Sequence, residues 1–194
     1  MTIRFAFLAA LPLFAFATPA AAQSVSGNSY KVTLEFATCV VSSDAADARA
    51  LMATVPETAE ATALLDKLKA TPGCTGKPND QALRGAIAER LYLTTYANAP
   101  AAPSGAAAPF TGSGNPALAR WDVLRCAASR DPVGADMLIR SELRSAAEKD
   151  AIKRFVPVIG ACTPAGVQLG LDKEKMRGLV AEGLLQARKA EAAN

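Results

Sequence analysis

Histidine is absent from all 194 residues of the chain. Its absence removes the commonest general base, the commonest metal ligand and every Ser–His or Cys–His catalytic pair. The chain also contains no G-x-S-x-G elbow, no phosphate-binding G-x-x-x-x-G-K loop and no calcium loop. Together these absences favour a non-catalytic role, with no cofactor and no metal.

The chain also lacks a strong charge of one sign. Its 21 Lys and Arg residues face 18 Asp and Glu residues, a formal net charge of +3. Surfaces that bind the phosphate backbone of nucleic acids concentrate positive charge on one face. We therefore expect no nucleic-acid partner.

Long apolar runs are missing everywhere except at the start of the chain. There, "MTIR" supplies a basic start, "FAFLAALPLFAFA" an apolar stretch and "TPAAAQ" small residues. This pattern is typical of a secretory signal peptide, which we predict over residues 1–22 with cleavage after Ala22. The apolar stretch is shorter than the roughly 20 residues that span a bilayer. We therefore expect a periplasmic or secreted protein with no transmembrane segment in its mature chain.

An internal duplication organises the mature chain. "LEFATCVVSSDA" aligns with "WDVLRCAASRDP" without gaps, and the same order of Cys, Ser-x-Asp, Cys and Arg-Gly follows in both copies. The aligned pairs are Cys39 with Cys126, Ser42 with Ser129, Asp44 with Asp131, Cys74 with Cys162, and Arg84-Gly85 with Arg177-Gly178. We predict a first repeat over 23–96 and a second over 118–194. A linker rich in Pro, Ala, Gly and Ser joins them over 97–117.

Four cysteines in an exported chain indicate two disulfides, which allow three connectivities. The duplication favours one disulfide in each copy, namely Cys39–Cys74 and Cys126–Cys162. A redox-active or metal-binding cysteine set is disfavoured, because the short C-x-x-C spacing and histidine are both absent.

The apolar spacing of the second repeat predicts helices. Asp131 is placed to cap one helix, and Ser145 begins a capping-box pattern, "SAAE", that opens the next. In the first repeat, residues 30–36 alternate in polarity as a strand would, but the duplicate is helical there and Asp44 occupies the capping position. We therefore predict an all-α fold with about four helices in each repeat.

The motif Arg-Gly-x-x-Ala-Glu occurs in the last predicted helix of each repeat. Its residues are Arg84, Gly85 and Glu89 in the first copy and Arg177, Gly178 and Glu182 in the second. Glycine costs about 1 kcal/mol against alanine inside a helix. We expect that a neighbouring helix approaches closely at these two glycines.

The arginines of the motif lie among apolar residues on a helical wheel, so we expect them to be buried and bonded within their own copy. Their acceptors would be helix-end carbonyls or acidic side chains, among them Asp44 and Asp131 or Asp80 and Glu174. An external anionic ligand is the alternative. The wheel places the two glutamates away from the main apolar stripe, so solvation is expected, with a contact surface as the alternative.

The order Cys-Val-Val, Gly-(Ala)-Cys and Arg-Gly-x-x-Ala-Glu-x-Leu-Tyr resembles a family of exported proteins from Gram-negative bacteria that carry the same two-cysteine unit twice. The residues that carry the resemblance are Cys39 to Val41, Gly73 and Cys74, and Leu83 to Tyr92, with Cys126, Gly160 to Cys162, and Met176 to Leu185 in the second copy. The second copy departs from the pattern at Gly183 and Leu185. The resemblance implies export and a helical architecture, and it implies no activity.

Two functional hypotheses follow, and a stress-related structural protein with no ligand is a third. The favoured one is a non-catalytic binding or scaffolding protein of the periplasm or cell envelope, with another envelope protein as its partner. The alternative is a carboxylate-dependent hydrolase acting on cell-wall or extracellular glycans, since paired carboxylates can catalyse glycoside cleavage without histidine.

Overall fold

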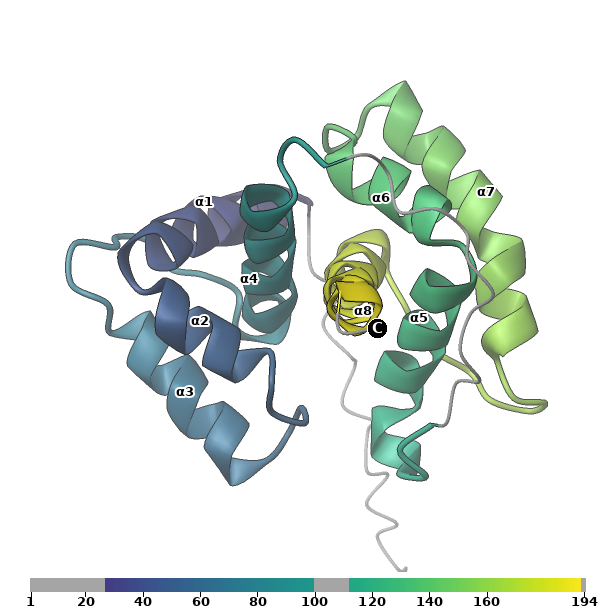
Figure 1. Ribbon diagram of the computed structural model, residues 1–194, viewed down its shortest axis with the longest axis horizontal. Helices are drawn as coiled ribbons and strands as arrows, with labels where there is room; N and C mark the ends of the chain where they lie inside the picture. The colour runs from purple at the N-terminus through teal and green to yellow at the C-terminus, as the bar shows by residue number, and fades with distance from the viewer. Residues whose placement is uncertain (1–26, 100–111, 193–194) are drawn as a thin grey trace, which may run out of the picture.

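The computed structural model describes residues 27–99 and 112–192, and within them it contains eight α-helices and no strand (Figure 1). The α-helices are α1 (Gly27–Ser43), α2 (Ala45–Leu51), α3 (Ala59–Lys69), α4 (Asp80–Thr95), α5 (Ala119–Arg130), α6 (Pro132–Arg140), α7 (Ala146–Cys162) and α8 (Lys173–Ala192). The prediction of an all-α fold with four helices in each repeat is confirmed.

One disulfide staples each repeat. Cys39 of α1 is bonded to Cys74 in the loop after α3, and Cys126 of α5 is bonded to Cys162 at the end of α7. The connectivity expected from the duplication is therefore confirmed.

The three predicted side-chain caps each mark the start of a helix. Asp44 accepts the backbone N–H of Asp47 at the start of α2, and Asp131 accepts the N–H of Gly134 at 2.9 Å at the start of α6. Ser145 accepts the N–H of Glu148 at 3.1 Å and begins α7. The three predicted caps are present, and each satisfies a backbone donor that the helix itself leaves open.

Helix α1 covers the segment whose alternating polarity resembles a strand. Tyr30, Leu34 and Phe36 are buried, whereas Val32 is 42% exposed. Burial continues at Ala37, so one buried face recurs at helical spacing from Tyr30 through Leu34. The helix predicted from the duplicate is therefore confirmed, and the alternating residues 30–36 form no strand.

Helices α4 and α8 lie at the centre of the molecule, where the two repeats meet. Figure 1 shows α8 almost end-on between α4 and the remaining helices of the second repeat. Helix α8 packs against α4, α5 and α6, and α4 packs against α1, α2 and α8. This placement makes the two motif-bearing helices the interface between the halves.

The predicted signal peptide (1–22) lies outside the described residues, as does most of the predicted linker. Within the part of the linker that the structure describes, Pro116–Leu118 forms a short 3-10 helix that leads into α5. The second helical unit thus begins slightly before the expected boundary at residue 118. No helix of the described segments is long and apolar enough to cross a bilayer.

Candidate functional site

The two motif glycines face each other where α4 and α8 cross. A Cβ atom added to Gly85 would lie 2.6 Å from the Cα of Gly178, and one added to Gly178 would lie 2.9 Å from the Cα of Gly85. Real Cβ atoms do not approach backbone so closely, so each position needs glycine. The expected close approach is present, and the neighbour is the matching helix of the other repeat.

The motif arginines and glutamates form two reciprocal ion pairs across this crossing. Arg84 donates to Glu182, with Nη2 to Oε1 at 2.6 Å and Nε to Oε2 at 3.0 Å. Arg177 donates to Glu89, with Nη2 to Oε1 at 2.9 Å and Nε to Oε2 at 3.0 Å. The arginine of each copy thus binds the glutamate of the other, as in the self-complementary interface of a two-fold dimer.

The expectation that Glu89 and Glu182 are solvated is wrong. Each is only 1% exposed. The helical wheel identified the face that α4 and α8 turn toward their own repeats, but each helix has a second buried face. That face lies against the other repeat, and the glutamates belong to it.

The acidic partners expected for the arginines are also wrong. Asp44 and Asp131 cap helices, and Asp131 additionally pairs with Arg154 at 2.9 Å. Asp80 pairs with Lys69 at 3.3 Å instead. Glu174 lines a pocket, and among the described residues it forms no bond with Arg177.

Backbone carbonyls complete the arginine sites, as expected. Arg84 donates to the carbonyl oxygen of Thr54 at 2.8 Å and to its hydroxyl at 3.1 Å. Arg177 donates to the carbonyl oxygen of Ser141 at 2.9 Å and to its hydroxyl at 3.3 Å. Thr54 and Ser141 occupy equivalent positions in the gapless part of the internal alignment. This recurring hydroxyl, overlooked in the sequence, was the signal that could have identified the acceptor.

Different side chains support the two glutamates. The Tyr30 hydroxyl of α1 donates to Glu89 at 2.9 Å, and the Trp121 indole of α5 donates to Glu182 at 2.9 Å. Burial raises the pKa of Tyr30 well above its usual value, and the adjacent Glu89 charge raises it further. Burial by itself would lower the pKa of Arg177, but the charge and hydrogen bonds of Glu89 raise it. Both groups therefore keep their protons at neutral pH.

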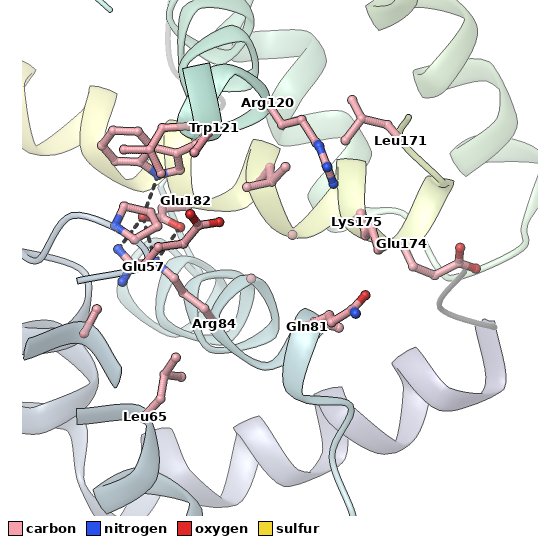
Figure 2. A pocket seen from close by; sticks show the side chains of 18 of the residues that line it. Glu57, Leu65, Gln81, Arg84, Arg120, Trp121, Leu171, Glu174, Lys175 and Glu182 are labelled. Carbon is pink, nitrogen blue, oxygen red and sulfur yellow. Dashed lines mark hydrogen bonds and ion pairs between the residues drawn. The ribbon is translucent and has the colours of Figure 1, made fainter. Parts of the chain in front are cut away.

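A pocket of about 580 Å³ opens beside the Arg84–Glu182 pair. One side is polar and consists of Arg84, Glu182 and Trp121, which we call the Arg84 corner (Figure 2). Side chains from both repeats form the apolar wall, among them Leu65, Leu118, Leu171 and Leu179. Its volume lies within the roughly 300–1,000 Å³ that is typical of small-molecule sites.

The rim of this pocket carries charges of both signs. Arg120 and Lys175 contribute cations, and Glu57 and Glu174 contribute carboxylates. Figure 2 shows Arg120 reaching toward the pocket from α5 and Lys175 on α8. The rim therefore does not select a ligand by net charge, and selection falls to the Arg84 corner.

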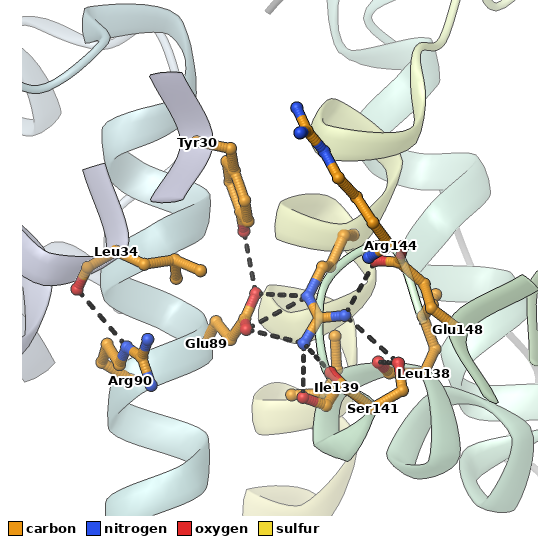
Figure 3. A network of polar contacts seen from close by, with 10 residues as sticks. Tyr30, Leu34, Glu89, Arg90, Leu138, Ile139, Ser141, Arg144 and Glu148 are labelled. Atoms are coloured by element: carbon orange, nitrogen blue, oxygen red, sulfur yellow. Dashed lines mark hydrogen bonds and ion pairs between the residues drawn. The ribbon is translucent and has the colours of Figure 1, made fainter. Parts of the chain in front are cut away.

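A second, smaller pocket of about 420 Å³ adjoins the Arg177–Glu89 pair. Figure 3 shows Glu89, Ser141, Glu148 and Tyr30 converging in this region between the repeats. Glu148 accepts a hydrogen bond from Arg177 at 3.1 Å and fills part of the space around the guanidinium. The two ion pairs thus differ in how far the protein's own side chains complete the arginine site.

Among the described residues, no group of three or more acidic or cysteine side chains could hold a metal ion. The carboxylate of the Arg84 corner, Glu182, accepts from both Arg84 and Trp121. The chemistry that this arrangement supports is the binding of a polar group by fixed donors, next to an apolar wall.

The chain matches no protein-family model, no curated protein and no solved structure.

Proposed function

We propose that this is an exported, non-catalytic binding protein of the periplasm or cell envelope, and that its ligand occupies the pocket beside the Arg84 corner. Two disulfides are consistent with an oxidising compartment. Membership of the exported Gram-negative family that the motif resembles is part of the same proposal.

The observation that carries the proposal is the pocket itself. It is mostly apolar, it has a few convergent polar groups in one corner, and both repeats contribute to its wall. Ligand sites in proteins commonly have this composition and lie at the junction of two structural units. A ligand seated there would contact both halves and would stabilise their association.

Binding fits the geometry better than glycan hydrolysis. A glycosidase needs one carboxyl group that donates a proton and a second carboxylate that acts as nucleophile or base. Glu182, the buried acid of the pocket, has its oxygens occupied by Arg84 and Trp121. We therefore propose a binding role for this acid and no proton transfer.

Trp121 makes the proposal testable, because it is the single tryptophan of the chain and lines the pocket. We would screen small amphipathic molecules by NMR and record whether each one shifts the indole N–H resonance of Trp121. Thr62→Phe places a ring in the pocket from an exposed position on α3. Thr94→Phe, exposed on α4 and outside the pocket lining, is the matched control.

The proposal predicts molecules that shift the Trp121 resonance in the wild type and in Thr94→Phe but not in Thr62→Phe. A screen in which no molecule shifts this resonance would contradict it. Equal shifts in both variants would also contradict it, because the molecules would then bind elsewhere.

A further inference from the structure

The two repeats differ at one position next to their arginines. Glu148 is the third residue of α7, and the internal alignment places Ala61 of α3 at the same position in the first repeat. The helix caps confirm this correspondence, because Ser145 and Thr58 begin the two helices three residues earlier. The first repeat therefore lacks the carboxylate that the second repeat supplies.

In the second repeat, Glu148 joins two donors. Its Oε1 accepts from Nη1 of Arg177 at 3.1 Å, and its Oε2 accepts from the backbone N–H of Arg144 at 2.7 Å (Figure 3). With this contact, all five guanidinium hydrogens of Arg177 have acceptors. The Arg177 site of the second repeat is thus completed by a side chain of the protein itself.

The same two donors are present in the first repeat. Nη1 of Arg84 donates to the Thr54 hydroxyl, and its second hydrogen has no acceptor among the described residues. Glu57 is the counterpart of Arg144, and both have a positive φ of 65°. The backbone N–H of Glu57 likewise has no acceptor within residues 27–99 and 112–192. In the second repeat, Glu148 accepts from both donors. In the first repeat, no carboxylate of the described residues accepts from the two equivalent donors.

The pocket extends to this position. Glu57, Ala61 and Arg84 all line it, and the Arg84 side chain retains 12% exposure whereas that of Arg177 retains 4%. A buried or half-buried guanidinium gains most from an ionised acceptor, because charge-assisted hydrogen bonds are roughly twice as strong as neutral ones. The site is therefore suited to an external carboxylate.

We propose that the pocket takes a ligand with a carboxylate on an apolar body. Its carboxylate takes the place of the missing Glu148 counterpart and accepts from Nη1 of Arg84 and the N–H of Glu57. Its apolar body lies along the wall that includes Leu65 and Leu179. This inference rests on the proposed function, because it names the ligand class of the same pocket.

The test compares 4-methylpentanoate with 4-methylpentanamide, which has nearly the same shape and no charge. Binding is followed through Trp121 of the full-length mature protein. We expect the carboxylate to bind at least tenfold more tightly than the amide. Equal or tighter binding of the amide would overturn the carboxylate assignment and leave a ligand pocket. If neither probe binds but other molecules from the screen do, the carboxylate assignment is likewise overturned and the ligand pocket stands. If no molecule binds at all, the proposed function itself is overturned.

A substitution in the first repeat tests the vacant carboxylate position directly. Ala61→Glu restores in the first repeat the residue that the second repeat has, and Ala63→Glu adds the same charge on the exposed face of α3. We expect Ala61→Glu to weaken binding of 4-methylpentanoate at least tenfold and to raise the urea midpoint of unfolding. Ala63→Glu should change binding less than twofold. A lowered midpoint and unchanged binding in Ala61→Glu would overturn the inference, because the position would then hold no vacant carboxylate site.

Discussion

At the scale of single residues, the buried Arg177 donates the hydrogen bonds that join the two halves at one of the two motif ion pairs. Arg177 is 3% exposed and bonds to Glu89, Glu148 and the loop after α6. Removing its side chain would leave Glu89 buried without its cationic partner. The cost of such a buried unpaired charge usually exceeds the net stabilisation that the intact pair provides.

We therefore expect Arg177→Ala to lower the free energy of unfolding by about 3–5 kcal/mol. Arg154→Ala is the control, because the Arg154 side chain is 48% exposed in its pair with Asp131, and such solvent-screened pairs contribute little to stability. Urea unfolding with the disulfides intact measures both. A loss below about 1 kcal/mol in Arg177→Ala would mean that folding does not need this arginine.

Two buried tyrosines make stability depend on alkaline pH. Burial raises the pKa of Tyr30 and of Tyr92, and their hydrogen bonds to Glu89 and Asp136 add to the shift. An unfolded tyrosine loses its proton above about pH 10, whereas these two keep theirs in the folded state. The free energy of unfolding should therefore fall as pH rises above about 10, and should be insensitive to these groups below it.

Above about pH 10, each tyrosine lowers the free energy of unfolding by up to about 1.4 kcal/mol per pH unit. The double variant Tyr30→Phe/Tyr92→Phe should show a shallower fall between about pH 9 and 11.5 than the wild type, whatever its stability at pH 8. An identical slope in variant and wild type would show that neither hydroxyl is protected by folding.

At the scale of elements, the crossing of α4 and α8 depends on its two glycines. A methyl group at Gly85 would meet backbone of Gly178 and force the helices apart. Overpacking of this kind typically costs 1–3 kcal/mol, although alanine itself favours a helix. The geometry of the interface therefore outweighs intrinsic helix propensity here.

We expect Gly85→Ala to lower the free energy of unfolding by about 1–2 kcal/mol. Gly160→Ala in α7 is the matched control, since nothing lies within 4 Å of the added methyl group, and it should be neutral or stabilise by up to about 1 kcal/mol. The two variants carry the same chemical change. If both stabilised the protein, the close crossing would be refuted.

The sequence was sufficient for the elements and insufficient for their contacts. Periodicity, caps and the duplication identified the helices, the disulfides and the close approach at Gly85. A helical wheel cannot tell solvent from a second protein surface, however, so Glu89 was assigned to solvent although it is buried against the other repeat. The pairing of Arg84 with Glu182, 98 residues away, depends on how the repeats dock, which local patterns do not encode.

At the scale of the whole molecule, the crossing couples the two repeats. The reciprocal pairs join α4 to α8, and the apolar core runs through both halves as one cluster. We therefore expect one cooperative unfolding transition. Each repeat nevertheless keeps its own disulfide, with sequence separations of 35 and 36 residues.

Replacing both Cys39 and Cys74 by serine should lower the stability of the whole chain by about 3.5–4 kcal/mol in the chain-entropy model. The transition should stay single, because the second repeat loses its interface when the first unfolds. Circular dichroism reports all helices, and Trp121 fluorescence reports α5 of the second repeat together with its contact at the Arg84 corner. Two separated transitions would indicate halves that fold independently.

The repeated motif holds the two halves together reciprocally, because the arginine of each repeat binds the glutamate of the other. The most direct measurement is a pair of double-mutant cycles on urea unfolding, one for Arg177→Met with Glu89→Gln and one for Arg177→Met with Glu182→Gln. We predict a coupling energy of about 2 kcal/mol or more for the first cycle and below about 0.5 kcal/mol for the second, whose residues share a helix but no bond. Equal coupling in both cycles, or stronger coupling within α8, would contradict the reciprocal interface.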